Sequence, residues 1–266
     1  MPKGNEWALI LGASSGFGAA TALELARSGL DIFGVHLDPR KTLPNAQRVI
    51  EGVKSMGREA VFFNVNAADA GKRAAIVDAI AERLAHEGED AHIRVFLHSL
   101  AFGTLVPYIA ESAREAVSQR QIEMTLDVMA NSLVYWVQDL VARRLLRSGG
   151  RVFAMTSSGA TRVMKSYGPV SAAKAALESH VRQLALELAP MGITVNAIRA
   201  GVTDTPSLRR IPGGPELLAQ APKRNPSGRA TTVEDVARAI AALSDERLYW
   251  MTGNVIGIDG GEDVTG

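Results

Sequence analysis

The sequence predicts an α/β domain built on a single doubly wound parallel sheet with helices on both faces. Short apolar runs without polar alternation recur along the chain, and such runs are typical of strands buried on both faces of a parallel sheet. Stretches with apolar residues at helical spacing lie between these runs, so strands and helices alternate. No repeat, low-complexity tract or linker divides the 266 residues, so we expect one domain over residues 1–266.

Composition narrows the possible functions. Hydrophobic residues make up 47% of the chain, which is enough for a substantial core. The net charge of +1, without a long block of one sign, argues against nucleic-acid and membrane-surface partners. No apolar run reaches the ~20 residues that span a bilayer, and no signal peptide is visible, so we expect a cytoplasmic protein. Cysteine is absent, which excludes disulfides and thiolate metal sites, and we expect no metal.

The first strand, Trp7–Gly12, leads into the glycine-rich segment GASSGFG and then a helical pattern that ends at Gly29. Strand, glycine-rich turn and helix in this order form a dinucleotide-binding unit of the Rossmann type. The glycines let the backbone turn tightly and approach a pyrophosphate, which binds the free N–H groups at the helix N-terminus.

The second strand, Asp31–Leu37, is expected to end near the adenosine ribose. An acid there binds the ribose hydroxyls of NAD, whereas a base accepts the 2′-phosphate of NADP. Asp38 is followed by Arg40 and Lys41, and the basic pair favours NADP, with NAD possible. Alternatively, the pair simply opens a solvated helix that runs to Met56.

The third and fourth strands, Glu59–Asn64 and Arg94–Leu100, end at the same edge of the sheet. We expect His98 to be structural, because no acid or nucleophile lies beside it in the sequence. The cofactor contacts expected at these strand ends are Asn64, Val65 and Ser99.

One long helix or two are expected over Glu115–Arg147, with Asn131 near the middle, where a buried amide could bend the helix or hold water. Gly149 and Gly150 are expected to end this segment. The remaining strands are expected at Arg151–Thr156, Thr194–Ala200 and Asn254–Ile258.

The segment Thr203–Arg229 contains five prolines and a Gly-Gly pair. So long an irregular stretch in a compact domain is commonly a lid or a binding segment. Because it follows the sixth strand, it should lie at the same sheet edge as the glycine-rich turn. The alternative is an ordinary surface loop.

The stretch SSGATRVMKSYGPVSAAK places Ser157, Tyr167 and Lys174 in order. At ~100° per residue, a position seven before Lys174 lies near its face of a helix, and that position is Tyr167. An ammonium nearby stabilises the phenolate, so we expect a lowered phenol pKa and proton exchange near neutral pH. The alternative is that Tyr167 caps a core and Lys174 is solvated.

These segments, together with NAIRAG and IDGG, resemble the short-chain dehydrogenase/reductase family over nearly the whole chain. Ordinary members have the tyrosine four residues before the lysine, where this chain has Val170. The seven-residue separation, and Ala200-Gly201 in place of Pro-Gly, resemble the enoyl-acyl-carrier-protein reductase branch, and in particular its NADPH-using members.

The resemblance implies roles for the matched residues. Lys174 would bind the nicotinamide ribose and lower the phenol pKa, Tyr167 would bind the substrate carbonyl oxygen, and Ser157 would assist there. It also implies a homotetramer. The other implied contacts are Asn131 in a proton-relaying water chain, Val202 at the nicotinamide carboxamide, and Gly12, Ser14, Gly16 and Phe17 around the pyrophosphate.

The displaced phenol indicates which bond is reduced. Three further helical residues move it by roughly 4.5 Å along the helix axis. In an enoyl thioester the hydride goes to Cβ, two bonds from the carbonyl carbon, so the acid must stand further from the nicotinamide than in ketone reduction. We therefore expect NAD(P)H-dependent reduction of a 2-enoyl thioester of acyl-carrier protein or coenzyme A, as in fatty acid biosynthesis. The alternatives are a 3-oxoacyl or other ketone reductase and a non-catalytic dinucleotide sensor.

Overall fold

A computed structural model describes residues 5–265 of the chain. Its centre is a seven-stranded sheet in the order β3-β2-β1-β4-β5-β6-β7, in which every pair of neighbouring strands is parallel. The predicted doubly wound sheet is thereby confirmed. The strands are β1 (Glu6–Leu11), β2 (Asp31–His36), β3 (Ala60–Asn64), β4 (His92–His98), β5 (Leu146–Ser157), β6 (Thr194–Ala200) and β7 (Val255–Ile258).

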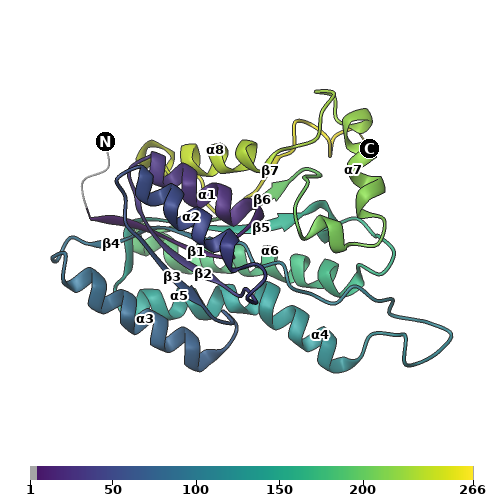
Figure 1. The fold of residues 1–266 in the computed structure, drawn as a ribbon, viewed down its shortest axis with the longest axis horizontal. Helices are drawn as coiled ribbons and strands as arrows, with labels where there is room; N and C mark the ends of the chain where they lie inside the picture. The colour runs from purple at the N-terminus through teal and green to yellow at the C-terminus, as the bar shows by residue number, and fades with distance from the viewer. Residues whose placement is uncertain (1–4, 266) are drawn as a thin grey trace.

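Helices cover both faces of the sheet (Figure 1). One face carries α1, α2 and α8, and the other carries α3, α5 and α6. Successive strand residues point to opposite faces, so Leu9 joins the core under α3, α5 and α6, while Ile10 joins the core under α1, α2 and α8. The helices are α1 (Gly16–Arg27), α2 (Leu43–Ser55), α3 (Ala70–Ala85), α4 (Gln119–Leu126), α5 (Ser132–Ala142), α6 (Gly168–Leu188), α7 (Gly214–Arg224) and α8 (Val233–Leu243).

The strand order reverses between β1 and β4. Strands β2 and β3 extend the sheet on one side of this point, and β5, β6 and β7 extend it on the other. In open parallel sheets the crevice at the carboxyl ends of the strands, where the order reverses, is the usual ligand site.

Two segments differ from the sequence-based expectation. Strand β5 begins at Leu146, and Gly149 and Gly150 lie inside it instead of ending a helix. The guanidinium of Arg151 explains part of this extension, because it is buried and donates to the carbonyl oxygens of Gly149 and Asp245.

The proline-rich segment is also more regular than expected, since α7 occupies Gly214–Arg224. Pro215 lies in the first turn of this helix, where its missing N–H breaks no hydrogen bond. Pro222 lies near the helix C-terminus, and Asn225 ends the helix. No helix within residues 5–265 combines the length and apolarity needed to cross a membrane.

Candidate active site

A cavity of about 890 Å³ lies at the carboxyl ends of the strands. Loops that follow β1, β2, β3, β4, β5 and β6 contribute to its wall, and the proline-rich segment closes one side. The expected site residues that line it are Gly12, Ser14, Gly16, Phe17, Val65, Ser99, Ser157, Tyr167, Lys174 and Val202.

The glycine-rich turn forms a cradle at the start of α1. A side chain at Gly12 would collide with the carbonyl oxygen of Ser99, and one at Gly18 would collide with the carbonyl oxygen of Gly12. Gly16 begins the helix with a φ of +54°, and the preceding Ser15 makes no side-chain cap. The first N–H groups of α1 are therefore free to bind an anion, and the cradle fits the pyrophosphate of a dinucleotide.

Asp38 lines the cavity just beyond β2. Burial would raise the pKa of Asp38, but hydrogen bonds with Ser14, Thr42 and His36 outweigh burial and lower the pKa. The His36 contact joins Nδ1 to Asp38 Oδ2 at 2.8 Å. An ionised carboxylate thus lies where a ribose is expected.

The basic pair expected at this end lies outside the cavity. Arg40 and Lys41 are exposed, and neither lines the wall, so their contact with a phosphate stays a prediction. Asn64 does not line the wall either. Its side chain accepts from the Asp38 N–H at 2.8 Å and donates to the Asp38 carbonyl at 2.9 Å, so it holds the Asp38 backbone in place.

Ser157, Tyr167 and Lys174 meet on the opposite side of the switch point. Ser157 is the last residue of β5, Tyr167 immediately precedes α6, and Lys174 lies in the second turn of that helix. Tyr167 and Lys174 are only 7% and 5% exposed. Within the described residues, Ser157 Oγ has no hydrogen-bond partner. The three side chains therefore present a phenol, a free hydroxyl and an amine to one cavity.

The expected lowering of the phenol pKa is wrong for this structure. Burial raises the pKa of Tyr167, and the nearby Ser157 hydroxyl offsets only part of that effect. Burial also lowers the pKa of Lys174 to about 8, against the opposing influence of the Glu178 carboxylate. The ammonium of Lys174 donates to the Met155 carbonyl at 2.7 Å, and not to the phenol. Desolvation therefore sets both values.

Asn131 does not reach the cavity. It ends a π-helical segment, Asp127–Asn131, that joins α4 to α5, and its Oδ1 lies 3.2 Å from Nε2 of His180. Met129 of the same segment lines the cavity instead. A water chain anchored on Asn131 stays a prediction. The wider π turn changes which side chains face the wall, and helical spacing alone does not reveal this.

His98 is structural in this fold, as expected. Its ring is fully buried, and Nε2 lies 2.8 Å from Ser132 Oγ. Burial, together with the nearby Lys174 charge, lowers the pKa of His98 to about 3, so the ring stays neutral.

The sequence does not predict a cluster of charges that lies in the cavity wall. Arg162 and Arg199 pair there with Asp263 at 3.1 and 3.0 Å. Glu262 accepts a hydrogen bond of 2.9 Å from the N–H of Val202, the residue expected to meet the nicotinamide carboxamide. The IDGG motif contained the signal, since Gly260 and Gly261 have positive φ and turn the chain back after β7.

The proline-rich segment forms an apolar part of the wall. Its side chains lie beside those of the α4–α5 region and of the loop before α6. Such a surface suits an acyl group better than a charged one. The apolar lining side chains are Phe102, Met124, Val128, Met129, Met164, Pro206, Leu208, Ile211 and Leu217.

Comparison with known proteins agrees with this geometry. A family model described as "Enoyl-(Acyl carrier protein) reductase" matches residues 12–262. A 1-cyclohexenylcarbonyl-CoA reductase of Streptomyces collinus is 29% identical over 259 residues, covering 96% of this chain and 86% of that protein. A 3-oxoacyl-[acyl-carrier-protein] reductase, FabG, of Aggregatibacter actinomycetemcomitans is 30% identical over 258 residues, covering 97% of this chain and 99% of that protein.

Among solved structures, a short chain dehydrogenase of Burkholderia cenocepacia J2315 in complex with NADP is 28% identical. The TM-score is 0.81, with 97% of this chain and 98% of that chain covered. These matches extend over the glycine-rich cradle and over the Ser157, Tyr167 and Lys174 cluster. The chain therefore belongs to the short-chain dehydrogenase/reductase family, in the group described as enoyl-(acyl carrier protein) reductase, and it is an NAD(P)-dependent oxidoreductase.

Proposed function

We propose that this enzyme reduces the carbon–carbon double bond of a 2-enoyl thioester. The supporting observation is the position of the phenol. Tyr167 lies in the cavity seven residues before Lys174, and the position four before the lysine is Val170, which is buried in the core. The names of the family model and of the Streptomyces relative support the same substrate class. A 1-cyclohexenyl group attached to a thioester carbonyl has its double bond conjugated with that carbonyl.

A nicotinamide cofactor bound at the glycine-rich cradle would supply the hydride. The Tyr167 phenol would donate a hydrogen bond to the thioester oxygen, where negative charge develops when Cβ is reduced, and a proton from water at Cα would complete the reduction. Its raised pKa keeps it protonated at neutral pH, so it acts as a donor from the start. Ser157 Oγ, free of other partners among residues 5–265, provides a second donor at the same oxygen.

Lys174 holds a positive charge beneath the reacting groups. With a pKa of about 8, it is largely protonated at pH 7. Its bond to the Met155 carbonyl fixes the amine, and the remaining N–H groups can bind the ribose hydroxyls of the cofactor. Lys174 thus orients the cofactor and stabilises the developing charge.

Reduction of a 3-oxoacyl thioester is the second candidate. The FabG relative, at 30% identity, and Ser157 beside the phenol favour it. A direct assay separates the enoyl reductase from the 3-oxoacyl reductase. Turnover of crotonyl-CoA, an enoyl thioester, is compared with turnover of acetoacetyl-CoA, a 3-oxoacyl thioester, with NADPH and with NADH. Turnover of crotonyl-CoA at least tenfold above that of acetoacetyl-CoA is the expected result, and the reverse order would overturn the enoyl proposal. The membership of a reductase family disfavours a non-catalytic sensor.

The remaining assignments also belong to the proposal. NADPH is the preferred cofactor, with support from the NADP complex of the Burkholderia relative, although Asp38 at the ribose end would suit NADH. The acyl group is carried by acyl-carrier protein or coenzyme A, and the family resemblance supports a homotetramer in the cytoplasm, with fatty acid synthesis as one setting.

A further inference from the structure

The turn after β7 is built so that one acidic side chain enters the cavity. Gly260 and Gly261 have φ values of +62° and +88°, and a side chain at Gly261 would lie 2.9 Å from Pro226 Cγ. Both glycines are therefore required for this turn. The chain returns through it, and Glu262 lines the cavity with only 8% exposure.

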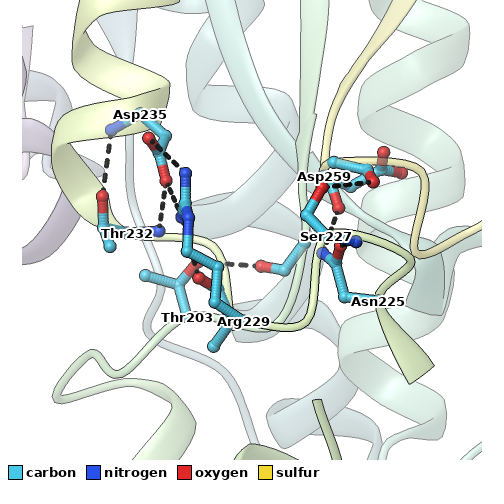
Figure 2. A network of polar contacts seen from close by, with 10 residues as sticks. Thr203, Asn225, Ser227, Arg229, Thr232, Asp235 and Asp259 are labelled. Atoms are coloured by element: carbon cyan, nitrogen blue, oxygen red, sulfur yellow. Dashed lines mark hydrogen bonds and ion pairs between the residues drawn. The ribbon is translucent and has the colours of Figure 1, made fainter. Parts of the chain in front are cut away.

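A network of hydrogen bonds holds the turn after β7 in place (Figure 2). Asn225 Nδ2 donates to the Asp259 carbonyl at 2.7 Å, and Asn225 Oδ1 accepts from the Ser227 N–H at 2.9 Å. The Asp259 carboxylate accepts from the Gly261 N–H at 2.9 Å. These bonds hold the backbone just before Glu262, and the Val202 N–H binds its carboxylate.

Glu262 is the carboxylate of this cluster that lacks a cation. Asp263 is paired with Arg162 and Arg199, and Asp259 lies 3.9 Å from Arg199. Within the described part of the chain, the Glu262 carboxylate forms no ion pair, and its one hydrogen-bond partner is the Val202 N–H. A nearly buried carboxylate without a cation is costly unless a ligand completes its interactions.

The sheet register shows which half of the cavity Glu262 occupies. Val202 lies two residues beyond Ala200, and Ala200 is the register partner of Ser157. Asp38 lies on the other side of the switch point, beyond β2. A dinucleotide whose pyrophosphate binds at the start of α1, with its adenosine toward Asp38, extends its nicotinamide toward Ser157. Glu262 therefore belongs to the nicotinamide half.

We propose that Glu262 contacts the nicotinamide end of the cofactor and binds its oxidised form more tightly than its reduced form. The oxidised ring carries a positive charge, which a nearby carboxylate attracts. The reduced ring is neutral and lacks this attraction. By favouring the oxidised form, Glu262 makes the bound cofactor a stronger hydride donor. This role rests on the cofactor site of the proposed function and not on the choice of substrate.

The test measures binding without substrate. Dissociation constants for NADP⁺ and NADPH, and for NAD⁺ and NADH, are determined by calorimetry for the wild type and for Glu262→Gln. Glutamine keeps an oxygen for the Val202 N–H but removes the charge. The ratio of oxidised to reduced dissociation constants is expected to rise about five- to tenfold in the variant. A tenfold rise corresponds to about 30 mV for a two-electron couple. Glu82→Gln, on the exposed face of α3, is the matched control and should leave the ratio unchanged.

An unchanged ratio, or an equal loss of affinity for both forms, would overturn the proposal and leave Glu262 as a structural cap of Val202. If Glu262→Gln does not fold, Glu262→Asp keeps the charge and withdraws it by one methylene group. In Glu262→Asp the ratio of oxidised to reduced dissociation constants should rise by a smaller factor than in Glu262→Gln. An unchanged ratio would again overturn the proposal. Because no substrate is present, these outcomes are independent of whether the enzyme reduces an enoyl or a 3-oxoacyl thioester.

Discussion

The Lys174 ammonium donates a hydrogen bond of 2.7 Å to the carbonyl oxygen of Met155, two residues before Ser157 on the same strand. This bond ties α6 to β5 at the floor of the cavity. The acceptor for the Lys174 ammonium is thus a backbone carbonyl of the strand and not the phenol oxygen of Tyr167. Protonation of the amine is therefore coupled to the folded state as well as to catalysis.

The first prediction is a stability change with pH. The pKa of Lys174 is about 8 in the folded chain against 10.5 ordinarily, so between these values the unfolded chain binds more protons. Stability contributed by this group therefore rises with pH, by roughly 1.5 kcal/mol between pH 8 and pH 9.5. Lys174→Met should lack this rise, whereas Lys72→Met, on an exposed face of α3, should keep it. Urea unfolding at pH 8 and pH 9.5 measures the change in the free energy of unfolding. The same change in the wild type and both variants would contradict a lowered pKa of buried Lys174.

Replacement of the phenol should separate cofactor binding from turnover. Tyr167→Phe removes one donor to the developing negative charge, so we expect cofactor affinity to persist and turnover to fall roughly 10²–10³-fold. Tyr108→Phe is a suitable control, because Tyr108 packs on Gly168 next to Tyr167 without lining the cavity. Near-normal enoyl turnover by Tyr167→Phe would exclude Tyr167 as the donor.

Transfer of the phenol to position 170 should not restore enoyl reduction. In Val170→Tyr combined with Tyr167→Phe, the new hydroxyl would stand nearer the hydride-accepting carbon, which suits a ketone. Val170 is buried, and a Cβ on Gly103 would lie 2.8 Å from its Cγ2, so the larger ring should also cost about 1–3 kcal/mol. Assays with crotonyl-CoA and acetoacetyl-CoA, together with a melting curve, test both effects. Full recovery of enoyl turnover would remove the geometric reason for an enoyl substrate.

Cofactor selection should depend on Asp38 more than on Arg40 and Lys41. The sequence alone predicts that alanine at both basic positions weakens NADPH roughly ten- to hundredfold. Because neither side chain lines the cavity, the structure predicts less than about a threefold change. Asp38→Ser should tighten NADPH relative to NADH, since it removes a negative charge from the ribose end. Apparent constants for both cofactors measure these effects, and a large loss from the double alanine variant would favour the prediction made from the sequence.

Ligand binding should slow hydrogen exchange in residues 203–229. This segment supplies an apolar wall of the cavity, so cofactor and acyl thioester bury it further. We expect the largest protection in α7 and in the turn before it. Equal exchange with and without both ligands would rule out a closing movement.

The sheet and the glycine-rich cradle could be predicted because their signals are local. Buried parallel strands such as β1 are short apolar runs, and the turn at Gly12–Gly18 needs glycine for steric reasons that any neighbouring backbone would impose. The helix α7 is harder to predict, because several prolines usually indicate an irregular segment, although a proline in the first turn is compatible with a helix.

The charged part of the site could not be found in the same way. Glu262 and Ser157 are 105 positions apart in the sequence, and only the sheet register and the turn at Gly260–Gly261 bring them to one cavity. Likewise, a π-helical segment decides that Met129 and not Asn131 faces the wall. Burial reverses the predicted direction of the Tyr167 pKa, and burial is a property of the whole fold.

The proline-rich segment is anchored at both ends by short polar contacts. Thr203 Oγ1 donates to the Gly201 carbonyl at 2.9 Å, and Asn225 Nδ2 donates to the Asp259 carbonyl at 2.7 Å. Several residues between these anchors line the cavity, and the two anchors bond to residues just beyond the ends of β6 and β7. Residues 204–224 therefore form a segment that can be exchanged between relatives without changing the sheet. Chimeras made in this way should acquire new acyl-group preferences.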